Sequence, residues 1–560
     1  MRDKVEPMRL SAVRQEPEAP GLHDATAGPG TRAFWLVLLL IASGGLAIRL
    51  YVGWKNFLDF DEWQHVFMAS GARWSDVAFE LRTNAHPPLF FLLLRPLVFL
   101  VPRNAAVYRT ISIAAGAGSV VVVGLIARKV LDSPVIQLLC AAAFALSRDA
   151  IAISDEIRSY QLAVFLVLLA FLFWLEMFSA NGANIRKLPF VAFAITASLA
   201  VSSHYSAVFF LGASVVVSLL LCTRQRKRSR WMFALAMAVP CAVFGLQYFI
   251  HAAEQPIQGY LYDFYRGLTP GESAAGFVVR NSRNFLNLFS PLELRSTTAF
   301  VPVLLLIVAA SAWTLSKQWR SRKRAAAAIL LAGIMVFELL LASLLQKYPF
   351  GGMLRHQYIA GPFVLIAAFV ALDCLLTLTP RRLRYAIPAL LLAASIANFV
   401  AEEPKLILHP GAVLVQDEFN TWRSAFPDAN AVYLDHWGVQ GYFIHTRGLA
   451  RTFVRRISDP AVIDEYHVSG GPDIFYDKSR DSLDFSDPSV YRSFAACLRD
   501  SGAKELSLFF FSPGNRPFPT KPGKMQDLVT QRAAEQGLIT TKVVATGTYL
   551  FAGFKLADSE

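Results

Sequence analysis

Long apolar blocks separated by short basic loops constrain this chain more than any other feature of its sequence. The blocks run for about 16 to 22 residues, which is the length that an α-helix needs to cross the hydrocarbon core of a bilayer. Of the 560 residues, 54% are hydrophobic and 17% are charged, a composition that is too apolar for a soluble enzyme of this size. The sequence therefore predicts an α-helical polytopic membrane protein.

The excess of positive charge, formally +13, is concentrated between the apolar blocks. Residues 224–230, 317–324 and 381–384 form short basic loops, which are typical of cytoplasmic connections that face anionic lipid. Nucleic-acid binding would instead need a basic face with interleaved aromatic residues outside the spans, and the sequence has none. We therefore expect membrane lipid as a partner and no nucleic acid.

Composition divides the chain into three parts. Residues 1–33 combine prolines with mixed charge and have no apolar period, as in a disordered cytoplasmic leader. Residues 34–401 hold the predicted spans. Residues 402–560 alternate strand-like and helical runs, which predicts a small α/β domain. The strand-like runs are 431–434, 473–476, 506–511 and 541–554, and the helical runs are 488–501 and 523–536.

An acidic stretch directly follows the first apolar block. Residues 58–65, LDFDEWQH, contain three carboxylates and one imidazole. The ordinary explanation is a polar loop that caps the next helix, because a carboxylate just outside a span is readily solvated. An amphipathic segment over residues 63–79 follows, however, and leads to His86-Pro87-Pro88 at the start of the next apolar segment. These neighbours favour a functional site at the membrane surface.

The basic loops also predict the orientation of the chain. If they are cytoplasmic, then the acidic stretch, residues 154–160 and the tail 402–560 all lie outside the cytoplasm. The apolar segments 87–101, 107–127 and 134–151 connect two outer-side ends, so they must cross an even number of times. One of the three is then short, re-entrant or not a span, and we expect about 11 crossings from about 12 candidate segments, with about 13 crossings as the alternative.

Three motifs follow one another on this outer side. Asp61-Glu62 stands in the first outer loop, a His-Pro-Pro-Leu sequence begins at His86, and a Glu-x-Arg-x-Tyr pattern spans residues 156–160. In these motifs the sequence resembles the GT-C glycosyltransferases of the protein O-mannosyltransferase-like branch, which is glycosyltransferase family 39 with its bacterial relatives. The resemblance covers residues 34 to about 225, extends more loosely to the loop 355–358, and does not reach the tail.

The resemblance implies a GT-C-like membrane domain that transfers a sugar from a polyprenyl-phosphate-linked donor, usually with inversion at the anomeric carbon. The implied acceptor is lipopolysaccharide, another envelope glycan or a protein. Similarity to bacterial galacturonosyl- and aminoarabinose transferases of lipopolysaccharide implies a bacterial inner membrane, with the active site and the C-terminal domain on the periplasmic side. For the tail we expect a role in acceptor recognition or in capping the site.

The resemblance assigns Asp61 as general base, with Glu62 orienting it or the acceptor. A sugar hydroxyl is a poor nucleophile at neutral pH, so an inverting transfer needs a carboxylate that takes its proton. The departing phosphate gains negative charge and needs fixed cations or hydrogen-bond donors. Arg158 and Arg355 fit this need, although either could be an interfacial anchor. The expected substrate-binding residues are Asp59, His86, Asp155, Glu156, Arg158, Tyr160, Arg355, His356 and Tyr358.

A divalent cation is an open alternative at the acidic stretch. Asp59, Asp61, Glu62, His65 and His86 supply the oxygen-rich ligands that Mg²⁺ or Mn²⁺ accept. A histidine on a helix face is more often a packing residue than a ligand, so the sequence leaves the metal unassigned.

A transporter or flippase of lipid-linked glycans is the alternative function. Such a protein would also have many spans and basic loops, but it should carry polar or Gly/Pro-broken spans near the middle of the membrane. Here the carboxylates concentrate at one surface, with Glu176 and Glu338 as exceptions inside apolar blocks. The sequence therefore favours an enzyme.

Overall fold

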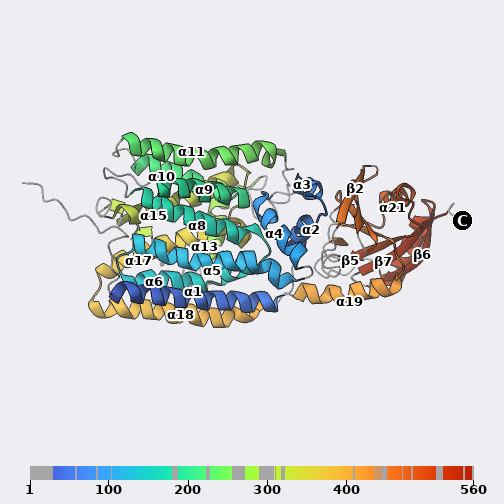
Figure 1. The fold of residues 1–560 in the computed structure, drawn as a ribbon. Coiled ribbons are helices and arrows are strands. Elements are labelled where there is room, and N and C mark those ends of the chain that lie inside the picture. The colour runs from blue at the N-terminus through green and yellow to red at the C-terminus, as the bar shows by residue number, and fades with distance from the viewer. Residues whose placement is uncertain are drawn as a thin grey trace, which may run out of the picture.

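A bundle of long helices and a β-sheet domain lie at opposite ends of the molecule and are joined by helix α19 (Figure 1). The coordinates are a computed structural model. The structure describes residues 29–56, 60–82, 86–101, 104–178, 187–221, 227–254, 271–288, 308–309, 311–313, 315–316, 322–407, 410–435, 438–439, 442, 451–458, 460–468, 471–480, 483–511, 521–546 and 549–557.

Helices make up most of the described membrane part. Its helices are α1 (Pro29–Lys55), α2 (Phe60–Ala69), α3 (Trp74–Arg82), α4 (Leu89–Leu100), α5 (Ala105–Val130), α6 (Pro134–Leu146), α7 (Arg148–Asp155), α8 (Ser159–Met177), α9 (Leu188–Ser203), α10 (Ala207–Leu221), α11 (Lys227–Ile250), α13 (Ala274–Leu288), α15 (Lys323–Leu344), α16 (Leu354–Gln357), α17 (Gly361–Thr377) and α18 (Arg381–Ile407).

Among the described residues, seven helices are long and apolar enough to cross a membrane, and the bent pair α6–α7 would make an eighth. Helices α4, α9 and α10 are shorter apolar helices. The predicted span 299–316 lies mostly outside the described residues, so the total of about 11 crossings stays a prediction. Residues 1–28 of the predicted leader also lie outside the described residues, and its last residues belong to α1, which begins at Pro29.

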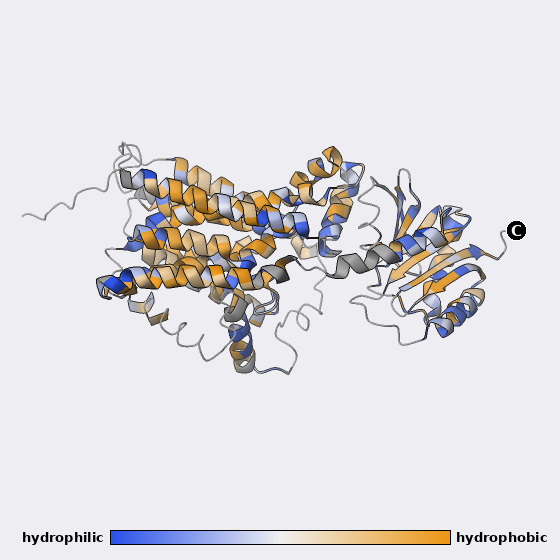
Figure 2. Ribbon diagram, turned by 90° about the horizontal axis from the view of Figure 1, so that it is seen from below, coloured by the Kyte–Doolittle hydropathy of each residue, from blue (hydrophilic) through white to orange (hydrophobic). Residues whose placement is uncertain are grey.

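Apolar side chains cover the outside of the bundle as well as its interior. Figure 2 shows hydrophobic residues along most of the length of its helices and hydrophilic residues gathered in the sheet domain and at helix ends. Leu36 and Leu40 on α1 and Leu390 on α18 are each more than 60% exposed. An apolar surface of this extent is expected where lipid, and not water, surrounds the protein.

The crossings between the acidic stretch and residues 154–160 agree with an even number. Helix α4 has 12 residues and is about 18 Å long, which is short of a hydrocarbon core of about 30 Å. Helix α5 is long enough, and α6 with α7 forms one path bent by 49°. Asp61 and Arg158 form an ion pair of 2.7 Å, which confirms that these two parts of the chain face the same side.

The C-terminal domain is a seven-stranded sheet in its described residues, in the order β2-β3-β4-β1-β5-β7-β6. Strand β1 is parallel to β4 and β5, and the other pairs are antiparallel. Alternate side chains point to opposite faces: Tyr433 packs on Phe494 of α21, whereas Phe509 packs on Trp422 of α19. The elements are α19 (Pro410–Ala425), β1 (Ala431–Leu434), β2 (Arg451–Ile457), β3 (Ile463–Val468), β4 (Asp473–Asp477), α21 (Pro488–Ser501), β5 (Leu506–Phe511), α22 (Pro522–Ala534), β6 (Leu538–Ala545) and β7 (Tyr549–Leu556).

The predicted α/β fold of the tail is confirmed, with three additions. Strands β1, β4 and β5 and helices α21 and α22 fall within three residues of their predicted bounds. The single run predicted over 541–554 is two antiparallel strands, β6 and β7. Helix α19 and strands β2 and β3 were not predicted, and α18 continues to Ile407, past the boundary expected at residue 401.

Buried polar contacts join the first helices of the bundle. Arg49 on α1 donates through Nε to the Ser154 Oγ on α7 over 3.0 Å, and through Nη1 to the carbonyl of Ala145 over 3.2 Å. Gly116 on α5 leaves the space for this contact, because a Cβ there would lie 2.3 Å from the Ser154 Oγ and 2.8 Å from the Arg49 Nε. The three helices can therefore approach only with glycine at this position.

Gly116→Ala should destabilise the bundle by about 1–3 kcal/mol, because the added methyl group must displace a buried hydrogen bond. Gly44→Ala is the matched control, since no atom lies within 4 Å of a Cβ at Gly44. Thermal unfolding of both variants in the same detergent measures the difference. Equal unfolding temperatures for the two variants would show that the close approach at Gly116 does not matter.

Candidate active site

Asp61 and two arginines meet at the end of the bundle that faces the sheet domain. The Asp61 Oδ2 atom accepts a hydrogen bond from Arg355 Nη1 over 2.6 Å and forms an ion pair with Arg158, whose Nη2 lies 2.7 Å away. Asp61 lies in the first turn of α2, Arg158 between α7 and α8, and Arg355 on α16, which is 294 positions from Asp61. The Asp61 side chain is 34% exposed, whereas that of Arg158 is 6% exposed. A reactant could therefore reach the carboxylate.

The two guanidinium groups control the pKa of Asp61. Burial alone would raise that pKa, but the charges of Arg158 and Arg355, with the hydrogen bond from Arg355, outweigh burial and lower it to about 2. The carboxylate is therefore ionised at every physiological pH and, while both arginines hold it, it is a weak proton acceptor.

Glu62, next to Asp61, turns into a different and fully buried network. Its carboxylate accepts two hydrogen bonds from Arg109 of α5, at 3.0 and 3.2 Å, and one from the Ile157 backbone N at 2.8 Å. Arg109 also pairs with Asp155 at 3.4 Å and donates to the carbonyl of Asn56. These contacts hold the start of α2 against α5 and α7. Glu62 therefore stabilises the position of α2 from the interior of the bundle and does not line the site beside Asp61.

Three histidines and a tyrosine form a packed group beside the arginines. The rings of His65 and His86 have their centroids 5.0 Å apart, those of His86 and His204 5.3 Å, and those of His204 and Tyr160 4.6 Å. Burial and the charge of Arg158 lower the pKa of His65 and of His204 to about 3 each. The imidazoles are therefore neutral at physiological pH, and the positive charge of the site resides on the arginines.

A tight turn places Arg355. Gly351 has φ +73°, and a Cβ there would lie 2.4 Å from the Asn281 carbonyl oxygen, so this position of the turn requires glycine. The Tyr348 hydroxyl donates to the carbonyl of His356 over 3.0 Å. Tyr358 points further into the bundle, where its hydroxyl donates to Gln161 Oε1 over 3.0 Å.

Most of the predicted site residues therefore fall into two groups. Residues of the first group are gathered around Asp61, and residues of the second group hold the Asp61 region in place from within the bundle. Glu156 and His356 lie near the arginines: the charge of Glu156 acts on Arg158, and the charges of both arginines act on His356. Asp59 lies outside the described residues. The first group is Asp61, His86, Arg158, Tyr160 and Arg355, and the second is Glu62, Asp155 and Tyr358.

Arg109 and His204 also belong to this region, although neither was among the predicted site residues. Arg109 stands alone in an apolar segment, and an isolated charge inside a span usually has a buried partner. That signal could have identified it. The position of His204 beside Tyr160 and His86 depends on the packing of α9 against α8 and has no comparable local signal.

In the part of the chain that the structure describes, no three His, Cys, Asp or Glu side chains are grouped as metal ligands would be. Of the residues considered for a cation, Glu62 binds Arg109 and Asp61 binds two arginines.

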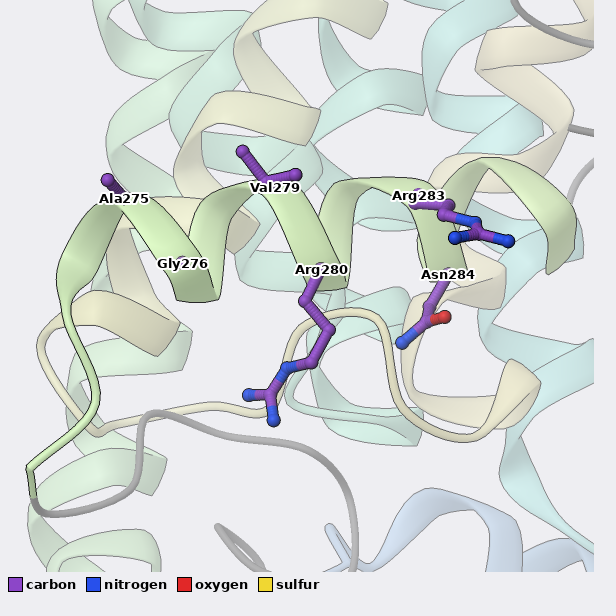
Figure 3. A pocket seen from close by; sticks show the side chains of 6 residues that line it. All are labelled: Ala275, Gly276, Val279, Arg280, Arg283 and Asn284. Carbon is purple, nitrogen blue, oxygen red and sulfur yellow. The ribbon is translucent and has the colours of Figure 1, made fainter.

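A cavity of about 590 Å³ lies elsewhere, on α13. Arg280 and Asn284 point to the same side of this helix (Figure 3). Arg280 is half-exposed and pairs with Glu272 at 2.7 Å. Phe285 stacks on Phe350 with ring centroids 4.9 Å apart, so α13 packs on the turn that leads to Arg355, and the residues that line the cavity are not those gathered around Asp61. The cavity is lined by Ala275, Gly276, Val279, Arg280, Arg283 and Asn284.

Comparison with known proteins agrees with this geometry. The family model of dolichyl-phosphate-mannose-protein mannosyltransferases matches residues 85–255. The sequence matches none of the curated proteins with which it was compared.

The fold is similar to that of ArnT from Cupriavidus metallidurans. In the apo state that structure gives a TM-score of 0.56 at 12% identity, over 93% of this chain and 98% of ArnT. Bound to undecaprenyl phosphate, it gives a TM-score of 0.53 at 13% identity, over 94% and 98%. The Archaeoglobus fulgidus oligosaccharyltransferase in the apo form gives 0.51 at 13% identity, over 89% of this chain and 71% of that one.

A partial match is to the S. cerevisiae protein O-mannosyltransferase complex bound to the sugar donor. It covers 42% of this chain and spans only 35% of the length of the yeast chain, at 20% identity and a TM-score of 0.32. The likeness to ArnT and to the archaeal enzyme, over nearly the whole chain, shows the GT-C fold that the sequence motifs implied.

Arg109→Leu should destabilise the protein by about 3–5 kcal/mol, because Glu62 and Asp155 would remain buried without their cation. Arg280→Leu is the control: its pair with Glu272 is half-exposed, and its loss should cost less than about 1 kcal/mol. Denaturant unfolding in detergent measures both changes. Similar stabilities for the two variants would contradict the importance of the buried network.

Proposed function

We propose that this protein, which has the GT-C fold, is a membrane glycosyltransferase that transfers a sugar from a polyprenyl-phosphate-linked donor to lipopolysaccharide, another envelope glycan or a protein. The observation that carries the proposal is the contact of one accessible carboxylate, Asp61, with two nearly buried arginines. A transfer of this kind needs a base and a binding site for a phosphate leaving group, side by side. The match to undecaprenyl-phosphate-bound ArnT supports this choice of donor.

Arg158 and Arg355 would bind the donor phosphate. Their planar guanidinium groups can each donate two parallel hydrogen bonds to phosphate oxygens, and their positive charge stabilises the negative charge that develops there. Tyr160, within 3.3 Å of Arg158 Nη1, would hold that arginine in place. The neutral His86 and His204 beside them offer further hydrogen-bonding groups without adding charge.

Asp61 would take the proton of the acceptor hydroxyl. As that oxygen bonds to the anomeric carbon, the bond from this carbon to the phosphate oxygen breaks and its electron pair stays on the phosphate, which leaves the carbon inverted. An anionic donor that draws Arg158 and Arg355 toward its phosphate would reduce the positive charge around Asp61. The pKa of Asp61 would then rise from about 2, so that donor binding itself makes the carboxylate a better base.

Glu62 is assigned a positioning role, because Arg109 and the Ile157 N–H already occupy its carboxylate. The orientation expected from charge also has support, since Lys129 and Arg322 pair with Glu176 and Asp373 at the opposite end of the bundle from Asp61. We place the Asp61 end and the sheet domain on the periplasmic side of a bacterial inner membrane.

Asp61→Asn should reduce sugar transfer by about 10²- to 10⁴-fold, because asparagine cannot accept the proton. Binding of undecaprenyl phosphate should persist, since both arginines remain. Asp132→Asn is the control, because Asp132 is largely exposed and pairs with Arg322 far from the site. Mass spectrometry of envelope glycolipids and glycoproteins measures the transfer. A transporter or flippase would predict unchanged glycan modification in Asp61→Asn, and that result would remove the catalytic assignment.

The pH profile tests the arginine pair. Because the lowered pKa keeps Asp61 ionised in the free enzyme, kcat/KM for the donor should show no acidic limb from this residue between about pH 5 and pH 8. Arg355→Gln removes one positive charge and raises that pKa, so its relative rate should begin to fall at a higher pH. Arg280→Gln should leave the profile unchanged. An acidic limb in the wild type that Arg355→Gln does not move would contradict this role of the arginines.

A further inference from the structure

A buried glutamate joins α3 to the sheet domain. Glu80 is 3% exposed, and its carboxylate accepts hydrogen bonds from the Tyr466 hydroxyl and, over 3.1 Å, from Lys478 Nζ. The same Lys478 Nζ lies 2.8 Å from the fully buried Asp464, which also accepts two hydrogen bonds from Arg456. One lysine therefore pairs with one carboxylate from each part of the protein, and Arg456 supplies the second positive charge.

Phe79, the preceding residue, is held by the same part of the sheet. Its ring stacks on Phe453 with centroids 4.3 Å apart. The cationic groups of Arg456 and Lys478 lie 4.9 and 5.1 Å from its centroid. These contacts come from β2 and from the residue after β4, so α3 packs against the β2-β3-β4 side of the sheet domain.

Helix α2, which carries Asp61, is tied to this junction. Arg95 of α4 donates to the backbone carbonyls of Ala69, Gly71 and Ala72, and so fixes the turn between α2 and α3. Phe67 on α2 packs edge-on against Tyr466, with centroids 5.6 Å apart. Helices α2 and α3 lie between the bundle and the sheet domain (Figure 1). Arg109 thus holds the start of α2 and the sheet domain holds its far end.

We propose that Glu80 is a positioning residue through which the sheet domain places Asp61 between Arg158 and Arg355. An ionised carboxylate as deeply buried as Glu80 is stable only beside a cation, and Lys478 supplies that cation only when the sheet domain is docked. Docking and the placement of α2 are therefore coupled by charge as well as by packing. The coupling itself is argued from these contacts alone, while its effect on sugar transfer rests on the function proposed above.

The pairing predicts a specific order among three variants. Lys478→Met removes the pair between the buried Glu80 carboxylate and the sheet domain, while Arg456 still pairs with Asp464, and should loosen α3 and α2 strongly. Glu80→Gln keeps an oxygen that can accept from Tyr466 and leaves the Lys478–Asp464 pair intact, so its effect should be small. The double variant also removes the buried charge of Glu80 and should recover most of the loss, which simple removal of contacts would not allow.

Hydrogen–deuterium exchange of the full-length protein in phospholipid nanodiscs measures the coupling. In Lys478→Met, backbone amides of residues 60–69 and 74–82 should exchange about tenfold faster than in the wild type, and the double variant should return to within about threefold. Lys555→Met is the matched control, because Lys555 is half-exposed and lies 3.9 Å from its partner Glu505, within the sheet domain. It should leave exchange in α2 and α3 unchanged.

Faster exchange in α3 alone, with α2 unchanged in Lys478→Met, would reduce Glu80 to a local attachment and overturn the proposal. So would an additive effect in the double variant. If Lys478→Met unfolds the sheet domain, Glu80→Leu removes both contacts, those with Tyr466 and with Lys478, from the α3 side and must then loosen α2. Transfer assays should rank the variants in the same order; a wild type without transfer would refute the proposed function, while the exchange data would still decide the coupling.

Discussion

The buried guanidinium of Arg109 is the interaction on which the rest of the site depends. It binds Glu62 and Asp155 and donates to the backbone carbonyls of Gly53 and Asn56, so it connects α5 with the end of α1, the start of α2 and the end of α7. Charges are costly to bury near lipid unless they are paired and hydrogen-bonded. Four helices must therefore come together in one arrangement, and that arrangement brings Asp61 to the surface.

The two adjacent carboxylates of the acidic stretch consequently have different surroundings. Glu62 is enclosed and satisfied, whereas Asp61 keeps a third of its side chain exposed and shares two arginines that could serve a phosphate equally well. In the proposed function, this division separates the supporting carboxylate, Glu62, from the catalytic one, Asp61. A carboxylate that is a weak base in the empty site and a stronger one once an anion has engaged its arginines would link proton transfer to the presence of the donor.

Much of the fold could be predicted from local sequence patterns. The apolar blocks, the amphipathic α2–α3 segment and the strands β1, β4 and β5 depend on hydrophobic periodicity, which is written in neighbouring residues. Strands β2 and β3 were not predicted because they are rich in charged residues. They are stabilised by ion pairs between the two strands, Arg455 with Glu465 at 2.6 Å and Arg456 with Asp464 at 2.7 Å. Such pairs can be recognised only when the register is known.

The sequence by itself determined that the chain is a membrane protein, that its acidic stretch and Arg158 face one side, and that its motifs resemble those of GT-C enzymes, because hydropathy, loop charge and short motifs are local properties. Tertiary structure decided which carboxylate meets which cation. Asp61 and Arg355 are 294 positions apart, and Glu80 and Lys478 are 398 positions apart. No local pattern encodes such contacts, since they arise only when the helices and the sheet domain pack and each buried charge must find a partner.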